Sequence, residues 1–156
     1  MIARKLRDFL DGEGVKYTVV AHSQAYTAQE IAALVHVPGH ELAKAVIVKI
    51  DGNLAIAVAP SSCHIDLELL RRDLAAKKVV LASETEFRDR FPDCETGAMP
   101  PFGHLYGMKT YVEATLAGGH EIAFNAGTHR ELIRMAYLDY ERLAKPVVLE
   151  MATLGL

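Results

Sequence analysis

The stretch AKAVIVKIDGNLAIAVAP, residues 43–60, carries the strongest structural signal in this chain. Two runs rich in strand-forming residues, about 43–50 and 53–59, flank the dipeptide Asp51-Gly52. An Asp-Gly pair suits the tight two-residue turn that joins antiparallel strands. The stretch therefore predicts a β-hairpin.

The segments before the hairpin predict two helices and a strand. Apolar residues at helical spacing over 2–11 predict a helix that glycines end, and residues 17–20 read as a short strand. In the segment 26–35, Thr27 and Glu30 have the spacing of a capping box, which predicts the start of a second helix.

After the hairpin, helical and strand patterns alternate. A leucine-rich helix is expected to start near Asp66, and residues 78–82 read as a short buried strand. Ser83 and Glu86 repeat the capping-box spacing, which predicts a helix that ends at Pro92.

The C-terminal third is less uniform. Residues 105–113 and 121–125 look like an antiparallel pair of strands joined by a glycine turn. The segment 129–146 has helical composition, but its first part could equally be a strand that enters a helix near Asp139. Together these patterns predict an α+β fold over residues 1–156: a single domain whose mixed, mostly antiparallel sheet has about six or seven strands, with helices around it.

Composition and charge limit the kinds of partner. Of the 156 residues, 51% are hydrophobic and 24% charged, which is typical of a soluble globular protein. No apolar run is long enough to span a bilayer, and the N-terminal residues lack the apolar core of a signal peptide, so we expect a cytoplasmic protein without a membrane partner. The formal net charge of −3 argues against wrapping long nucleic acid, but it permits binding of one nucleic-acid terminus or of a nucleotide.

Metal and cofactor chemistry find no support in the sequence. Cys63 and Cys94 are the only cysteines and have no metal-binding or redox spacing, and the seven histidines form no paired motif. No glycine-rich nucleotide fingerprint is present. We therefore expect neither a metal site nor a cofactor.

Lys44 is unusual for its place on the first strand of the hairpin. Side chains alternate faces along a strand, so Lys44 shares its face with the core-like row Val46, Val48 and Ile50. An ammonium group held in a partly apolar pocket suits an anionic or carbonyl-bearing ligand. The alternative is that Lys44 precedes the strand and extends its ammonium group to water.

On the second strand, one face carries only alanines. Ala55, Ala57 and Ala59 alternate with larger residues, which allows close packing of another element or leaves room for a ligand. Packing is the favoured interpretation.

The stretch FNAGTHREL, residues 124–132, places two polar residues after a glycine turn. Thr128 and Glu131 have the spacing of a third capping box, which is the structural interpretation of the threonine. His129 follows a strand end, where site residues often lie, although a lone histidine is also common in packing.

The loop GAMPPFG, residues 97–103, is stiff and has few side chains. Pro100 and Pro101 fix φ and lack N–H donors, while Gly97 and Gly103 allow conformations that side chains forbid. Free amides would then be found at Phe102 and Gly103, where they could stabilise an oxyanion. A rigid crossover between helix and sheet is the alternative.

Three stretches, LAKAVIVK (42–49), GAMPPFG (97–103) and NAGTHREL (125–132), resemble the YbaK/ProX-type aminoacyl-tRNA deacylase family. The same domain is inserted in bacterial prolyl-tRNA synthetases for editing. The resemblance covers nearly the whole chain and implies the fold of that family.

The resemblance implies hydrolysis, without metal or cofactor, of the ester that joins a wrong amino acid to the 3′ end of a tRNA. Lys44 matches the essential lysine of the family. The resemblance implies that Lys44 and His129 act in catalysis, and a histidine at position 129 resembles members that clear alanine from proline tRNA. The residues that match the family loops are Gly97, Pro101, Phe102, Gly103, Gly127 and Thr128. The resemblance implies that Gly103 acts in catalysis through its amide and that the others bind the substrate.

Two departures from the family pattern concern specificity. Ala45 stands where some members have a polar residue that helps to hold the substrate, and Pro100 stands where many have a small or hydroxyl residue.

The resemblance thus implies a trans-editing hydrolase for a small amino acid such as alanine, serine or cysteine. Its partners would be the aminoacyl-tRNA 3′ end and, as an open question, a synthetase. A non-catalytic module that binds a tRNA end, a nucleotide or a synthetase is the alternative.

Overall fold

The predicted hairpin forms the middle of the main sheet. A computed structural model describes residues 2–22 and 38–154, and in it β2 (Leu42–Ile50) pairs antiparallel with β3 (Asn53–Pro60). Asp51 and Gly52 have φ values of +49° and +86°, so both central residues of the turn are left-handed. This is the backbone that the right-handed twist of two paired strands requires, and it explains the Asp-Gly pair.

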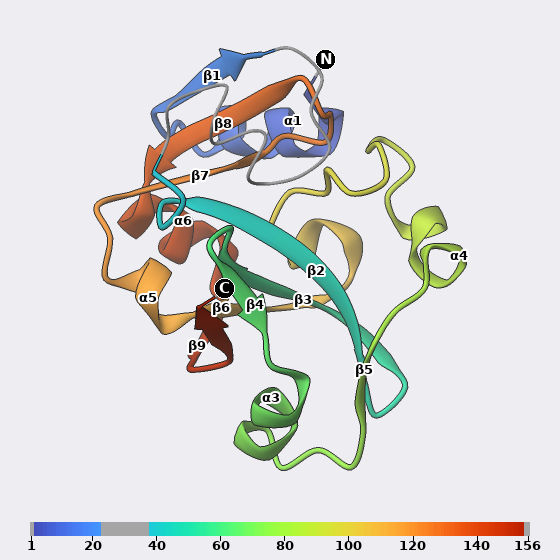
Figure 1. Cartoon of the computed structure of the whole chain (residues 1–156). Coiled ribbons are helices and arrows are strands. Elements are labelled where there is room, and N and C mark those ends of the chain that lie inside the picture. Colours follow the sequence, from blue (N-terminus) through green and yellow to red (C-terminus); the bar gives the residue numbers. More distant parts are fainter. Residues whose placement is uncertain (1, 23–37, 155–156) are drawn as a thin grey trace.

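In the described part of the chain, further strands extend the hairpin on both sides into a sheet of eight strands (Figure 1). The strand order is β1-β8-β7-β2-β3-β6-β9, and β5 pairs with the far end of β2. The added strands are β1 (Tyr17–Ala21), β5 (Val79–Leu81), β6 (Lys109–Glu113), β7 (Glu121–Asn125), β8 (Glu131–Ala136) and β9 (Val147–Leu149). A separate two-stranded sheet joins β4 (Cys63–Ile65) to β10 (Ala152–Leu154). The pairs β2–β7, β3–β6 and β6–β9 are parallel and the others antiparallel. The expectation of a mixed, mostly antiparallel sheet is confirmed, with more strands than expected.

The helices begin at the capping residues that the sequence indicated. Asp66 accepts hydrogen bonds from the amides of Glu68 and Leu69 at the start of α3 (Leu67–Asp73), and Ser83 and Glu86 form a capping box on the short α4 (Glu84–Phe87). The helix expected from Thr27 and Glu30 lies outside the described residues. The remaining helical segments are α1 (Arg4–Gly12), α5 (Ala114–Ala117), α6 (Tyr137–Ala144) and the 3-10 turns η1 (Arg88–Arg90) and η2 (Gly103–Tyr106).

Two hydrophobic clusters lie on opposite faces of the central strands. The larger one joins α1, α6 and the 97–103 loop to the sheet, with Leu6, Phe124 and Tyr140 fully buried. The smaller one packs α3 and the C-terminal segment against the alanine face of β3, where Ala55 and Ala57 lie with Leu70, Tyr111 and Met151. The packing interpretation of Ala55 and Ala57 is confirmed.

Two strand predictions need correction. Residues 105–113 are not one strand, because η2 occupies the first part and β6 begins only at Lys109. In addition, β6 does not pair with β7: α5 separates them, so that β6 runs parallel to β3 while β7 runs parallel to β2. The open question at 129–146 resolves as β8 followed by α6.

Across residues 2–22 and 38–154, no helix combines the length and the apolar character needed to cross a membrane.

Candidate active site

Lys44 lies near the start of β2, on the face predicted from strand alternation. Its neighbour across the hairpin is Ala59, and Val46 and Val48 on the same face belong to or pack against the smaller hydrophobic cluster. Burial lowers the pKa of the Lys44 ammonium group, while the charge that the nearby Cys63 thiol can carry acts in the opposite direction. Lys44 is thus a half-buried cation with only the small side chain of Ala59 beside it on β3.

Asn125 ends β7, the strand that pairs with the start of β2, and the sequence did not single it out. The parallel strands β2 and β7 pair Leu42 with Ala123 and Ala43 with Phe124, and continuing this register places Lys44 beside Asn125 on the same face. The Asn125 side-chain oxygen Oδ1 is buried and accepts no hydrogen bond from any described residue. Only the pairing of two distant strands could reveal this neighbour.

The first half of the 97–103 loop is tied to the turn at 126–129. The amide of Gly127 donates to the carbonyl of Ala98 at 2.9 Å, and the amide of Glu95 donates to the carbonyl of Gly127 at 2.8 Å. The ring nitrogen Nε2 of His129 lies 2.8 Å from the carbonyl oxygen of Thr96. The loop at Gly97 is therefore joined to the turn of Gly127, Thr128 and His129, which directly follows β7, the parallel neighbour of β2.

Gly127 is required by both conformation and space. Its φ is +91°, and a Cβ at this position would lie 2.5 Å from the Cβ of Ala3. The amide of Ala3 also donates to the carbonyl of Ala126 at 2.7 Å, which holds the N-terminal residues against this turn. Any other residue would separate the two segments.

Glu95 is a second residue that sequence reasoning missed. Its carboxylate accepts hydrogen bonds from the Thr128 hydroxyl and the His129 amide, and these bonds hold the pKa of Glu95 below its usual range. Thr128 and His129 are both only 4% exposed. Thr128 precedes β8 rather than a helix, so the predicted capping box with Glu131 is wrong: the threonine hydroxyl bonds Glu95 and the amide of Arg130.

The second half of the loop lies inside the protein, and one expectation about it is wrong. The amide of Phe102 donates to the carbonyl of Pro100 and that of Gly103 to the Thr110 hydroxyl, both at 2.9 Å, so neither amide is free to bind a carbonyl. The hydrogen-bond acceptor of the Gly103 amide, Thr110, lies on β6, and the loop sequence alone could not identify it.

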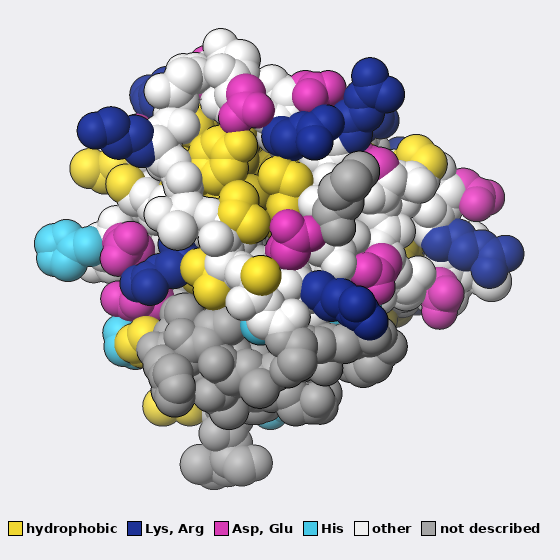
Figure 2. Space-filling model, turned by 90° about the horizontal axis from the view of Figure 1, so that it is seen from above, with side chains coloured by type: hydrophobic (Ala, Val, Ile, Leu, Met, Phe, Trp, Pro, Cys, Tyr) yellow, Lys and Arg dark blue, Asp and Glu magenta, His cyan; other side chains and the backbone are white. Residues whose placement is uncertain are grey.

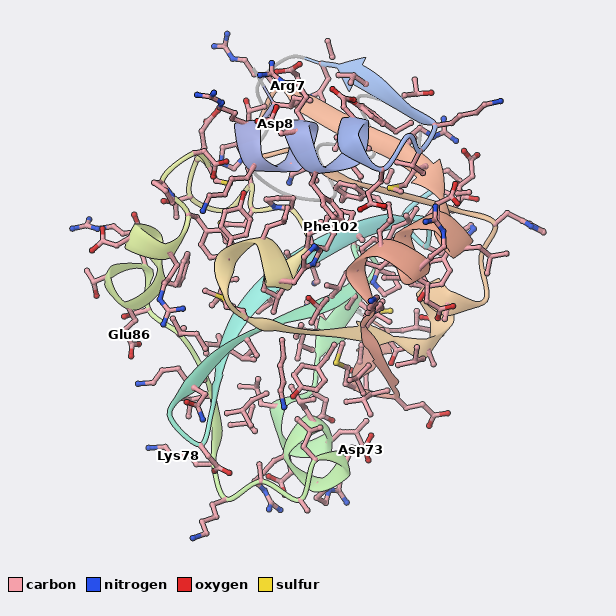
Figure 3. All side chains as sticks on the ribbon, turned by 180° about the vertical axis from the view of Figure 1, so that it is seen from behind. Arg7, Asp8, Asp73, Lys78, Glu86 and Phe102 are labelled. Atoms are coloured by element: carbon pink, nitrogen blue, oxygen red, sulfur yellow. The ribbon has the colours of Figure 1, made fainter. Side chains whose placement is uncertain are left out.

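The side chains of this half confirm the rigid-crossover interpretation. Phe102 is fully buried between α1 and the sheet, with its ring edge-on to those of Phe124 and Tyr140 (Figure 3). The Tyr140 hydroxyl donates to the carbonyl of Pro101 at 2.9 Å. A Cβ on Gly103 would lie 2.5 Å from the carbonyl oxygen of Met108, which explains the glycine.

For metal chemistry, the described ranges 2–22 and 38–154 contain no group of three or more His, Cys, Asp or Glu residues placed to hold an ion. Cys63 and Cys94 are both free thiols. The polar groups that β2, the end of β7 and the tied loops contribute are instead the Lys44 ammonium, the Asn125 carboxamide, the His129 imidazole and the exposed backbone of Gly97.

Known proteins resemble this chain over most of its length. The chain is 28% identical to the multifunctional Ser/Thr-tRNA deacylase ProXp-y of Escherichia coli K12 over 148 residues, which is 92% of this chain and 88% of that protein. Among solved structures, a candidate trans-editing enzyme for prolyl tRNA synthetase superposes with a TM-score of 0.82 at 22% identity, covering 97% of this chain and 96% of the other. The hypothetical protein APE2540 gives a TM-score of 0.86 at 18% identity, covering 96% of this chain and all of the other.

At these identities the two solved structures establish the fold alone, and the family rests on the sequence. The profile of the aminoacyl-tRNA editing domain matches residues 22–143, a range that contains Lys44, the 97–103 loop and the 126–129 turn. This chain belongs to the family of aminoacyl-tRNA editing domains.

Proposed function

We propose that this chain is an aminoacyl-tRNA deacylase that removes a small, wrongly attached amino acid from a tRNA. Its family of editing domains and its relative named as a Ser/Thr-tRNA deacylase support this reaction class. Serine is the first substrate to test, followed by alanine and cysteine.

One observation supports the proposal: the half-buried Lys44 belongs to β2, which pairs in parallel with β7, and the turn of Gly127, Thr128 and His129 directly follows β7. An aminoacyl ester is already activated, so its hydrolysis needs orientation and charge stabilisation more than a protein nucleophile. A fixed cation beside bare backbone supplies both.

In the proposed reaction, water attacks the ester carbonyl carbon and the bond from that carbon to the ribose oxygen breaks. The products are the free amino acid and a tRNA with its terminal ribose hydroxyl restored. Lys44 holds the terminal phosphate or the developing negative charge at the carbonyl. Gly97, which is exposed, lets the substrate approach the backbone, while Gly127 packs against Ala3. Thr128 and His129 hold the two loops in place.

The oxyanion donor must lie elsewhere than Phe102 and Gly103, whose amides are taken. We assign it to the amide of Gly97, which donates only to the sulfur of Met99 at 3.2 Å. A thioether is a weak acceptor, so a substrate oxyanion can displace it. Gly103, with Pro101 and Phe102, then acts by fixing the shape of the loop.

Contact with the tRNA is proposed to centre on its 3′ end. The net charge is −3, and on the face drawn in Figure 2 acidic and basic side chains are interspersed. Such a surface suits recognition of a terminus, with additional tRNA affinity supplied by a synthetase partner.

The test is release of amino acid from Ser-, Ala- and Cys-charged non-cognate tRNAs. We expect turnover by the wild-type protein, and a loss of at least about a hundredfold for Lys44→Met, which keeps the aliphatic stem but removes the charge. Lys77→Met, a change at an exposed lysine, is the matched control and should retain full activity. Intact esters after incubation with folded wild-type protein would refute the proposal.

The second candidate is a binding module that grips the tRNA end without turnover. The occupied amides of Phe102 and Gly103 favour it, because they remove two expected oxyanion donors. Saturable binding of uncharged tRNA by a protein that leaves every charged tRNA intact would establish this alternative.

A further inference from the structure

A second cavity, of about 980 Å³, lies away from the Lys44 site. It is formed by α1, η2, the start of β6 and the end of α6, and none of its lining residues belongs to the group around Lys44 and His129. Its apolar lining includes Met108 and Leu143 of the larger hydrophobic cluster, and Tyr111 of the smaller one. Figure 3 shows α1, η2 and α6 converging on this side of the sheet.

The cavity exists because β6 is longer than its edge partner. β9 pairs only with Tyr111–Glu113, so the edge of β6 at Lys109 and Thr110 stays unpaired. Lys145, at the end of α6, has a left-handed φ of +48° and turns the chain away before β9 begins. Residues of the helix end and of the free strand edge therefore both line the cavity.

The rim of this cavity is basic although the chain as a whole is acidic. Lys109, Arg142 and Lys145 line it, against the single carboxylate of Glu13. Within residues 2–22 and 38–154, neither Lys109 nor Lys145 forms an ion pair, whereas Arg142 contacts Asp139 at 3.4 Å. Two exposed ammonium groups are therefore available to an anion.

The floor is apolar and aromatic. The Phe9 ring lies edge-on to the His104 imidazole with centroids 4.8 Å apart, and Met108 and Leu143 complete the surface. Partial burial, and secondarily the charge of Lys145, lower the pKa of His104 below its usual value. An imidazole ring beside a phenylalanine ring suits a flat group such as a nucleobase.

We propose that this cavity binds a nucleoside monophosphate, with the base over Phe9 and His104 and the phosphate between Lys109 and Lys145. The size suits such a ligand, since small-molecule sites span about 300–1,000 Å³. The nucleotide can be free or part of a bound tRNA, and the second case rests on the proposed deacylase function. Because the experiment measures binding without turnover, failure of either proposal is visible separately.

The experiment is calorimetric titration with AMP and CMP, in a Lys44→Met background that removes phosphate binding at the other site. We expect saturable binding to the Lys44→Met protein. A double variant that adds Lys109→Gln and Lys145→Asn should bind at least about tenfold more weakly, because charge-assisted hydrogen bonds are lost. Asparagine is chosen at 145 because it tolerates the left-handed conformation.

The matched control is Lys77→Gln with Lys78→Gln, which changes the net charge equally at two exposed lysines. Figure 3 shows Lys78 near the far end of the β2–β3 hairpin, distant from α1 and η2. No saturable binding to the Lys44→Met protein, or an equal loss in both pairs, overturns the proposal.

A parallel titration with uncharged tRNA identifies the source of the nucleotide. If the double variant at Lys109 and Lys145 loses as much affinity for tRNA as it loses for AMP or CMP, the cavity is assigned to a nucleotide of the tRNA. Unchanged tRNA affinity, with AMP or CMP binding lost, assigns it to a free nucleotide.

Discussion

The imidazole Nε2 of His129 lies 2.8 Å from the carbonyl oxygen of Thr96, across 33 residues of sequence. A carbonyl only accepts hydrogen bonds, so Nε2 carries the hydrogen in this contact. The bond connects the 125–132 motif to the residue directly before Gly97, where the 97–103 motif begins. In the proposed function, His129 is therefore a positioning residue.

Replacing His129 by alanine should lower deacylation more than the loss of one contact suggests. We expect kcat/KM to fall by about tenfold or more, because Gly97 loses its support, and the free energy of unfolding to fall by about 1–3 kcal/mol. Deacylation kinetics and chemical denaturation measure the two effects. His120→Ala, at an exposed histidine, is the control; equal effects of both changes would contradict the positioning role.

Glu95 should matter for activity more than for stability. Its carboxylate is exposed but accepts hydrogen bonds from the Thr128 hydroxyl and the His129 amide. Glu95→Gln weakens these bonds, so kcat/KM should fall several-fold while the melting temperature changes little. Glu150→Gln removes an exposed carboxylate elsewhere and should leave kcat/KM unchanged. Wild-type kinetics in the Glu95 variant would show that this carboxylate does not order the turn.

Gly127→Ala should destabilise the protein by about 2–4 kcal/mol, through strain at positive φ and a clash of the new Cβ with Ala3. Gly12→Ala is the matched control, since nothing lies within 4 Å of a Cβ there and its φ is not positive. We expect the control to be neutral or slightly stabilising. Denaturant unfolding of both variants checks this, and similar stability losses would argue against the clash.

Glu113 should make stability depend on pH. It is 3% exposed and accepts four hydrogen bonds, from the Thr115 amide and hydroxyl and from the amides of Met151 and Ala152. Burial acts to raise the pKa of Glu113, but these bonds outweigh it and the pKa is lowered from 4.5.

The pKa of Glu113 is lower in the folded than in the unfolded state. Between these two pH values, the unfolded chain therefore binds more protons than the folded protein. The stabilisation is therefore present above pH 4.5 and is lost as pH falls through the lower, folded-state pKa. We expect Glu113→Gln to cost about 2–3 kcal/mol at neutral pH and to flatten the acid limb of the stability curve. Unfolding measured from pH 3 to 7 in both proteins tests this, and parallel curves would contradict it.

Local features of the fold were predictable from the sequence. The Asp51-Gly52 turn, the caps at Asp66 and Ser83 and the face of Lys44 depend on residues close together in the chain, and each is confirmed. Alternation and capping are properties of neighbouring residues, so sequence spacing carries them.

The pairing of β6 was not predictable in the same way. Residues 109–113 and 121–125 both look like strands, and proximity in sequence favours a hairpin. The short helix α5 between them instead sends β6 beside β3 and β7 beside β2. Local strand patterns do not specify which distant strand is the partner.

By itself, the sequence determined the hairpin, the rigidity of the 97–103 loop and the three motifs that identify the family. Only the tertiary structure decided which loop amides are available, because Thr110 reaches the Gly103 amide from β6. It also decided that β7, which ends at Asn125, runs beside the start of β2, and that Glu95 holds Thr128 and His129. The physical reason is that a hydrogen bond depends on atoms within about 3 Å in space, and partners far apart in the chain meet only when the sheet is assembled.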